Sequence, residues 1–329
     1  MATKATRNDV AKKAGVSPAV VSYVLNNSNY VSEAKRKAVL EAIKELDYSP
    51  NLFAKGLRTN RSFSIALVGD SLQDELFGPL SVRLLNEGFY SSLFYSQLSD
   101  SFIQRVIDGR FDAVFMTSNG FTPQQLNRIT ENGTPVILYK SRDYSGLSDR
   151  IFTMAPDFYG GVLQAMRYLI QKGHGRIAYI PPLRYRTRGL GGDDFRVQAY
   201  SQALQDVRLP QDARLVCTHT DNVAQIWQDV QAMFQMQARP TALVVGDDYL
   251  AAQLMQYLRT AGYRIPEDVA VVGWGNIPSA MITTPQLTTV DSGVDRFAGK
   301  VAEALVDVAN GLRLQDYYSP VKLVVRDST

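Results

Sequence analysis

The stretch Gly15-Val16-Ser17-Pro18-Ala19-Val20-Val21-Ser22-Tyr23-Val24-Leu25-Asn26 decides how the first sixty residues fold. Gly15 permits a tight turn. Ser17 can then cap a helix with Pro18 at its first position, where a missing N–H costs nothing. Four apolar residues at helical spacing are expected to face inward: Val20, Val21, Val24 and Leu25. The stretch therefore predicts a turn followed by an amphipathic helix.

Another helix is predicted before this turn, and a basic third helix after it. Thr6 can cap the first helix, whose apolar face is Val10, Ala11 and Ala14. The first two helices and their turn form a helix-turn-helix pattern, in which the second helix enters a DNA major groove. The positions left outside on that second helix are Ala19, Ser22, Tyr23 and Asn26.

Basic residues are concentrated at this end of the chain. Through Arg61 there are eleven Lys and Arg but five Asp and Glu, whereas the whole chain of 329 residues carries a net charge of +3. A basic head on a slightly acidic body suits polyanion binding at one end, driven by the release of counterions from phosphates. Double-stranded DNA is therefore the expected partner.

The counts of cysteine and histidine argue against disulfides and metal sites. Cys217 is the only cysteine, so an internal disulfide is impossible and a thiol-ligated metal cluster is excluded. With only His174 and His219, a histidine-based metal site is not expected either, and we predict no cofactor. The N-terminus lacks an apolar signal core and no apolar run could span a bilayer, which predicts a cytoplasmic protein.

Past Ser62, short apolar stretches alternate with amphipathic helical ones. The predicted strands are residues 64–69, 90–95, 112–116, 135–139, 176–180, 214–218, 242–245, 269–273 and 321–326, and predicted helices include 158–171, 249–261 and 294–310. This alternation indicates parallel sheets covered by helices, with ligands at the carboxyl ends of the strands. Because about 270 residues exceed one comfortable core, we expect two α/β lobes, a cleft and repeated crossings of the chain.

Over nearly its whole length the chain resembles the lactose-repressor (LacI/GalR) family of bacterial transcription regulators. Besides the head, the resemblance rests on residues 169–178, 240–243, 247–248, 262–269, 272–274, 285–290 and 323–326. It implies an all-α helix-turn-helix head (1–49), a hinge helix and linker (50–61) and a two-lobed, periplasmic-binding-protein-like α/β effector and dimerisation module (62–329). The first lobe would comprise 62–156 and 291–313, and the second 157–290 and 314–329.

The resemblance also places the DNA-contacting positions of the head, which are Thr6, Ser17, Pro18, Ala19, Ser22, Tyr23 and Asn26. Pro18 and Ala19 offer only apolar contact, suited to a thymine methyl group. Where Tyr23 stands, many family members carry arginine or another strong hydrogen-bonding group. We therefore expect modest direct readout by this helix; the alternative for Tyr23 is a ring packed along the sugar–phosphate edge.

Residues 50–57 correspond to the family's hinge helix, which the resemblance implies folds on the operator and drives a leucine, here Leu57, into the minor groove. An apolar wedge kinks a flexible base step. The other hinge positions expected at DNA are Asn51, Ala54, Lys55 and Arg58, of which the two cations can hold phosphates. Gly56 disfavours helix by about 1 kcal/mol relative to alanine, which suits a segment that orders only when bound. The alternative is a polar linker.

For the effector cleft the resemblance points to Asp70, Phe77, Lys140, Arg184, Arg196, Asp247, Trp274, Gly275 and Asn276. Arg196 matches the family arginine that bonds sugar hydroxyls or a ligand carboxylate. Gly275 replaces the usual Asp, and Lys140 stands where many relatives have an acid. Arginine pairs carboxylates and phosphates bidentately, whereas neutral sugars usually want carboxylate acceptors as well. We therefore predict an anionic effector, either a sugar acid or a sugar phosphate.

Other readings remain open. A regulator controlled by a protein partner, or by no ligand, fits the altered cleft, while a sugar-binding receptor is disfavoured by the basic head. An enzyme is disfavoured because no nucleophile, base or phosphate-loop constellation is present. Two motifs that resemble enzyme signatures, at residues 191–195 and 246–248, are expected to be loop and helix-cap sequence. The sequence thus predicts a homodimeric repressor of a carbohydrate or related catabolic operon, without catalytic residues, that binds a pseudo-palindromic operator.

Overall fold

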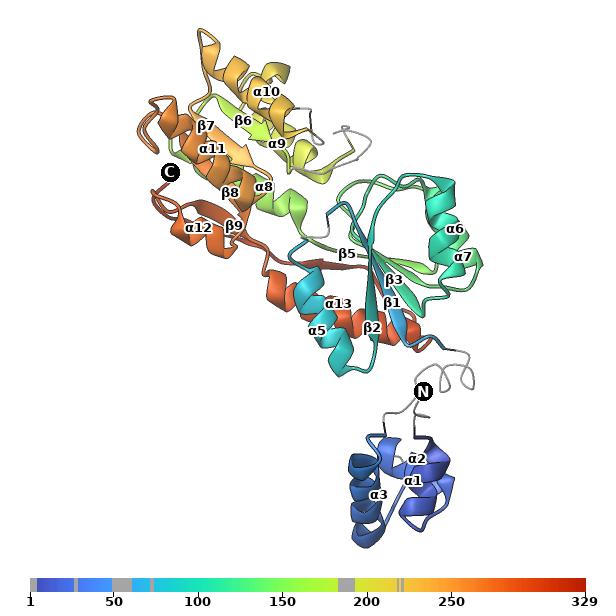
Figure 1. Ribbon diagram of the computed structural model, residues 1–329. Coiled ribbons are helices and arrows are strands. Elements are labelled where there is room, and N and C mark those ends of the chain that lie inside the picture. Colours follow the sequence, from blue (N-terminus) through green and yellow to red (C-terminus); the bar gives the residue numbers. More distant parts are fainter. Residues whose placement is uncertain are drawn as a thin grey trace. The chain divides into compact units, whose positions relative to one another are not determined.

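The computed structural model describes residues 5–26, 29–48, 61–71, 74–182, 193–217, 219 and 222–329 (Figure 1). The chain divides into two compact units, Met1–Ser62 and Phe63–Thr329, which we call the head and the body. Among the described residues, no helix is both long and apolar enough to cross a bilayer.

The described residues of the head form three helices, α1 (Arg7–Lys13), α2 (Pro18–Asn26) and α3 (Glu33–Glu45). A capping box begins α1: the Asp9 N–H donates to Thr6 Oγ1 over 3.3 Å, and the Thr6 N–H donates to Asp9 Oδ2 over 2.8 Å. Gly15 has a φ of +63°, as the turn requires. The buried core consists of Val10, Ala11, Val21, Val24, Val39 and Ala42. Val20, which was expected to face inward, is only half-buried and lies outside this core.

The first lobe of the body is a six-stranded sheet in the order β10-β5-β4-β3-β1-β2. Its strands are β1 (Ser64–Gly69), β2 (Tyr90–Tyr95), β3 (Ala113–Met116), β4 (Val136–Leu138), β5 (Ile151–Pro156) and β10 (Tyr317–Ser319), and all neighbours pair in parallel. Helices α5 (Phe77–Asn86) and α13 (Val294–Ala309) pack on one face. Helices α6 (Asp100–Asp108) and α7 (Pro123–Glu131) pack on the other.

The second lobe is a five-stranded sheet in the order β11-β9-β8-β7-β6. Its strands are β6 (Ile177–Ile180), β7 (Ala242–Val245), β8 (Ala270–Gly275), β9 (Thr288–Asp291) and β11 (Lys322–Val324), of which only β11 pairs antiparallel. Helices α8 (Phe158–Gln171) and α9 (Phe195–Asp206) cover one face. Helices α10 (Val223–Gln235), α11 (Asp248–Thr260) and α12 (Pro278–Ile282) cover the other.

Within the described residues the chain passes between the two lobes three times, after β5, after β9 and after β10. The expected boundary near residue 314 is wrong, because β10 pairs with β5 and therefore belongs to the first lobe. The last crossing lies between Ser319 and Lys322.

One predicted strand, residues 214–218, is also wrong. Residues Ala213–Leu215 form a short 3-10 helix, and Val216 makes only an isolated bridge to Tyr179. The physical reason is Asp212, whose Oδ1 accepts the Arg214 backbone N–H over 3.1 Å and thereby caps a turn. Thr218 lies outside the described residues.

Candidate nucleic-acid interface and effector site

The start of α2 projects from the head. Ser17, Pro18 and Ala19 are exposed, and Ser17 Oγ accepts the Val20 N–H over 3.4 Å. One turn further on, Tyr23 keeps 36% of its surface exposed. Because Val21 and Val24 are buried, the helix is held by its inner face while its N-terminal end stays accessible. This is the geometry that a recognition helix needs.

Thr6 has a different role from the other predicted contact residues. Its hydroxyl donates to Asp9 Oδ2 over 2.6 Å, and hydrogen bonds from the Thr6 side chain and backbone lower the pKa of Asp9. Thr6 therefore fixes the start of α1. The side chain of Asn26 lies outside the described residues, as do the hinge positions Asn51, Ala54, Lys55, Leu57 and Arg58.

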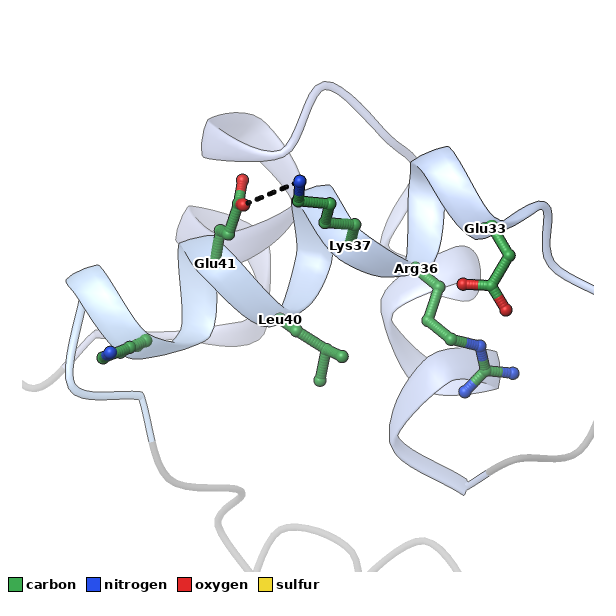
Figure 2. A pocket seen from close by; sticks show the side chains of 6 residues that line it. Glu33, Arg36, Lys37, Leu40 and Glu41 are labelled. Atoms are coloured by element: carbon green, nitrogen blue, oxygen red, sulfur yellow. Dashed lines mark ion pairs between the residues drawn. The ribbon is translucent and has the colours of Figure 1, made fainter.

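The outer face of α3 forms a shallow pocket (Figure 2), lined by Glu33, Arg36, Lys37, Leu40, Glu41 and Lys44. Lys37 Nζ and Glu41 Oε1 are 4.0 Å apart in an exposed pair one helical turn apart. All the lining residues come from a single helix, and their charges have both signs. This is the composition of a solvated helix face, and we assign no ligand to it.

An aromatic cluster joins the two lobes. The ring of Phe158, at the start of α8, stacks on Trp274 of β8 with centroids 5.4 Å apart, and Tyr139, just after β4, meets Phe158 edge-on at 5.4 Å. Gly161 makes this packing possible, because a Cβ there would lie 2.5 Å from Trp274 Cζ3. Trp274, expected at the edge of the cleft, is partly buried in this stack.

Arg196 is buried beside the aromatic cluster. Its guanidinium carbon lies 4.8 Å from the centre of the Phe158 ring. Asp194 accepts from Arg196 Nε over 3.0 Å and from the terminal nitrogen over 2.7 Å. Burial opposes the positive charge, but Asp194 outweighs it and raises the pKa of Arg196. The predicted ligand-binding arginine therefore has an internal carboxylate partner, which periodicity in the sequence did not reveal.

Next to this pair, backbone segments of the two lobes bond to each other. The Phe195 N–H donates to Ser141 O over 3.1 Å, and Arg142 and Asp194 form an antiparallel bridge. Between these contacts, Lys140 Nζ lies 5.7 Å from the centre of the Phe195 ring. Lys140 and Arg196, two cations predicted from the sequence, thus come from different lobes to one region.

Carboxylates gather elsewhere along the lobe boundary. Burial first, and then the charges of Asp248, Asp74 and Asp247, raise the pKa of Glu75 to about 7. The fully buried Asp248 accepts from Thr289 Oγ1 over 2.5 Å and from the Ile277 N–H over 3.0 Å, yet burial raises its pKa to about 6. Asp247 caps α11 by accepting the Leu250 N–H, as the helix-cap interpretation predicts.

Asp70 lies at the end of β1, where Ser96 Oγ donates to its Oδ1 over 2.5 Å. The structure gives other roles to some predicted cleft residues. Phe77 is only 2% exposed and packs in the core of the first lobe. Asn276 Oδ1 accepts from Arg326 over 2.6 Å.

Gly275 has a φ of +126°, a region that side-chain-bearing residues rarely adopt. The chain therefore takes a path here that disfavours a side chain, such as the aspartate that the family resemblance implies at this position. Arg184, with Arg186 and Arg188, lies outside the described residues.

Sequence reasoning missed one cluster altogether. Cys217, His219 and Asp229 bring three potential ligand atoms within 4.8 Å of one another. The signal available was a cysteine and a histidine two residues apart, but the carboxylate comes from a helix that begins later. The expectation of no metal site rested on residue counts, which do not register such mixed clusters.

Comparison with known families gives two matches. The model for bacterial regulatory proteins of the lacI family matches residues 6–51, and the periplasmic binding protein-like domain matches residues 166–329. The HTH-type transcriptional repressor PurR of Proteus mirabilis is 30% identical over 92% of this chain and 90% of its own. The NTD biosynthesis operon regulator NtdR of Bacillus subtilis is 27% identical over 98% of this chain and 99% of its own.

Two solved structures are similar to this chain over almost its full length. The lac repressor dimer bound to operator and the anti-inducer ONPF superposes with a TM-score of 0.79 at 21% identity and covers 99% of both chains. The complex of the transcriptional regulator CelR with cellobiose gives a TM-score of 0.65 at 27% identity, over 99% of this chain and 100% of that one. The first of these shares the fold; the second is similar in sequence as well.

Proposed function

Since the chain belongs to the LacI family of bacterial regulatory proteins, we propose that it represses a carbohydrate or related catabolic operon in response to an anionic, hydroxyl-rich effector. Its partners are operator DNA, a second copy of the chain and a small molecule. We propose no catalytic function. Because its operator is bacterial DNA, the protein is proposed to act in the cytoplasm.

The exposed start of α2 supports the proposal that the head binds operator DNA. Ser17, Pro18 and Ala19 present two apolar surfaces and one hydroxyl, with Tyr23 one turn behind. Such a surface makes few bidentate contacts to bases, so much of the specificity must come from deformation of the DNA. We assign that part to Leu57 in the hinge, with Lys55 and Arg58 on the flanking phosphates.

Two chemically different regions between the lobes support the proposal of an anionic, hydroxyl-rich effector. Lys140 and the Arg196–Asp194 pair lie beside Phe195 and Phe158, and Lys140 has no carboxylate within ion-pair distance among the described residues. Glu75 and Asp247, together with Asp70, supply acceptors elsewhere. A ligand with hydroxyls and one anionic group satisfies both regions, and a sugar acid is the simplest example.

A ligand held by residues of both lobes changes the angle between them. It would thereby change the spacing of the two hinge segments in the dimer, so that both heads no longer fit their half-sites. The backbone contacts between residues 141–143 and 193–195 are the ones that such a rotation would rearrange.

Two measurements test this proposal. A gel shift with genomic fragments should show a salt-sensitive, sequence-selective complex, and its absence would refute the DNA-binding part. Calorimetry with gluconate, glucuronate and sugar phosphates against neutral sugars tests the effector. Lys140→Gln should weaken binding of the anion at least about tenfold, whereas the exposed Lys300→Gln should not. Tight binding of a neutral sugar alone would refute the anionic effector, and no binding at all would favour control by a protein partner.

A further inference from the structure

Cys217, His219 and Asp229 meet in the second lobe, and none of the three is among the residues assigned to DNA or effector. Asp229 Oδ2 lies 2.6 Å from His219 Nδ1 and 3.1 Å from Cys217 Sγ. A thiol, an imidazole and a carboxylate therefore converge on one point.

Two local structures hold these side chains in place. The Cys217 N–H donates to Tyr179 O over 3.0 Å, which ties this segment to β6. Asn222 Oδ1 accepts the Ala224 N–H over 3.0 Å and so fixes the start of α10, the helix that carries Asp229. Cys217 also packs in a core cluster with Ile226 of the same helix. The positions of the ligand atoms thus follow from the packing of a sheet edge against a helix.

We propose that Cys217, His219 and Asp229 form a binding site for a divalent cation of the zinc class. Thiolate, imidazole and carboxylate are the ligands that zinc prefers, at about 2.0–2.3 Å. In a tetrahedron such bonds place the ligand atoms about 3.3–3.6 Å from one another. The present separations, from 2.6 Å up to at most 4.8 Å, need only small side-chain shifts to reach this arrangement. Solvent would supply the fourth ligand.

The three side chains of the cluster differ in solvent exposure, so that a cation can reach them from one side. Cys217 is 1% exposed, whereas the Asp229 and His219 side chains are 23% and 42% exposed. An ion can therefore enter from the histidine side while the thiol stays shielded from oxidants. Because a thiol binds the cation as a thiolate, binding must displace a proton, and the affinity should rise with pH.

A bound cation would join the segment after the 3-10 helix to α10. It would stabilise the second lobe by mass action, because the unfolded chain holds the three ligands apart. This inference uses none of the residues assigned to DNA or effector, so it stands or falls separately from the proposed function.

The test is titration of the untagged, reduced, chelator-treated full-length protein with Co²⁺ as a spectroscopic substitute for Zn²⁺. Wild type should develop a cobalt–thiolate band in the near ultraviolet and visible bands of tetrahedral cobalt, both abolished by Zn²⁺. Cys217→Ser should remove the thiolate band. His219→Ala and Asp229→Asn should each weaken cobalt affinity at least about tenfold. His174→Ala, which removes the other histidine, is the matched control and should bind as wild type does.

Thermal unfolding gives a second readout. Zn²⁺ should raise the Tm of wild type and of His174→Ala but not that of His219→Ala, while Mg²⁺ should have no such effect. The proposal is overturned if wild type shows no cobalt–thiolate band, or if His219→Ala and Asp229→Asn keep the full affinity. The second result would mean that the cluster is only a hydrogen-bond network. Because these two side chains are partly exposed, their variants remain informative even where Cys217→Ser perturbs folding.

Discussion

Arg196 folds back onto Asp194, two residues before it, and the two form a bidentate ion pair in which both residues are less than 5% exposed. Arg214 and Asp212 repeat the geometry almost atom for atom, with Nε to Oδ1 at 2.9 Å and the terminal nitrogen to Oδ2 at 2.8 Å. The Arg214 side chain, however, is 74% exposed. The body thus contains the same Asp-x-Arg ion pair twice, once with a buried arginine and once with an exposed one.

The pair of motifs allows a matched comparison of Asp194→Asn with Asp212→Asn. Asp194→Asn should lower the free energy of unfolding by about 3 kcal/mol, because it leaves a buried guanidinium without a counter-charge. Asp212→Asn should cost less, since water screens Arg214 and also reaches Arg176, the second and partly exposed partner of Asp212. Urea unfolding of both variants measures the difference. Equal losses would mean that the Arg196 charge is solvated after all.

The fully buried Asp248 should make stability depend on pH. Its pKa is raised from 3.8 to about 6, so the native state holds this proton more tightly than the unfolded chain does. That contribution is complete below about pH 3.8 and is lost as the pH rises through 6. Asp248→Asn, which has no such proton to lose, should gain up to about 3 kcal/mol relative to wild type between pH 4 and 7. Urea unfolding across this range checks it, with the exposed Asp295→Asn as control; a pH-independent difference would contradict the prediction.

Gly161→Ala should disturb the aromatic cluster at the Phe158–Trp274 stack, which lies within the second lobe. The new Cβ would meet Trp274 at 2.5 Å, so the indole must leave its stack on Phe158, at a cost of about 1–3 kcal/mol. In a Trp227→Phe background, the fluorescence of Trp274 reports the displacement. Gly78→Ala, where nothing lies within 4 Å, should be neutral or stabilising by up to about 1 kcal/mol. An unchanged Trp274 spectrum in Gly161→Ala would show that the ring adapts in place.

Tyr23→Ala should weaken binding to the operator about tenfold at fixed salt, if its ring contacts a base edge. Loss of affinity for operator and for unrelated DNA alike would instead place the ring on the sugar–phosphate edge. Gel shifts on both DNAs separate these outcomes. Tyr249→Ala, an exposed tyrosine of the body, should leave both affinities unchanged.

Local signals in the sequence predicted most of the fold. The bounds of β1, β2, β7 and α8 agree with the predicted ranges. For β1 and β7 the signal is a buried apolar stretch, and for α8 it is one buried helix face, whereas β2 has no fully buried residue. The β10 strand was missed since three residues at a sheet edge leave no periodicity to detect. Residues 214–218 look like a strand, but the side chain of Asp212 caps a 3-10 helix over Ala213–Leu215.

The candidate site was less predictable than the fold. Resemblance located Lys140 and Arg196, yet the pairing of Arg196 with Asp194 depends on how a helix start folds back, and hydrophobic pattern carries no trace of it. The burial of Phe77 likewise follows from its tertiary packing against Gly69. Electrostatic effects between residues far apart in the chain, such as those of Asp247 and Asp248 on the pKa of Glu75, required the structure.

The three crossings between the lobes also set an order in which the body can be completed during synthesis. The first lobe is begun at residue 64, but its core needs Phe297, Val301 and Leu305 of α13, and its sheet needs β10. These segments leave the ribosome only after α8 to α12 of the second lobe. The half of the body that is made first must therefore wait with a sheet face that α5 covers only in part, and a nascent chain of this kind is where a chaperone would be expected to bind.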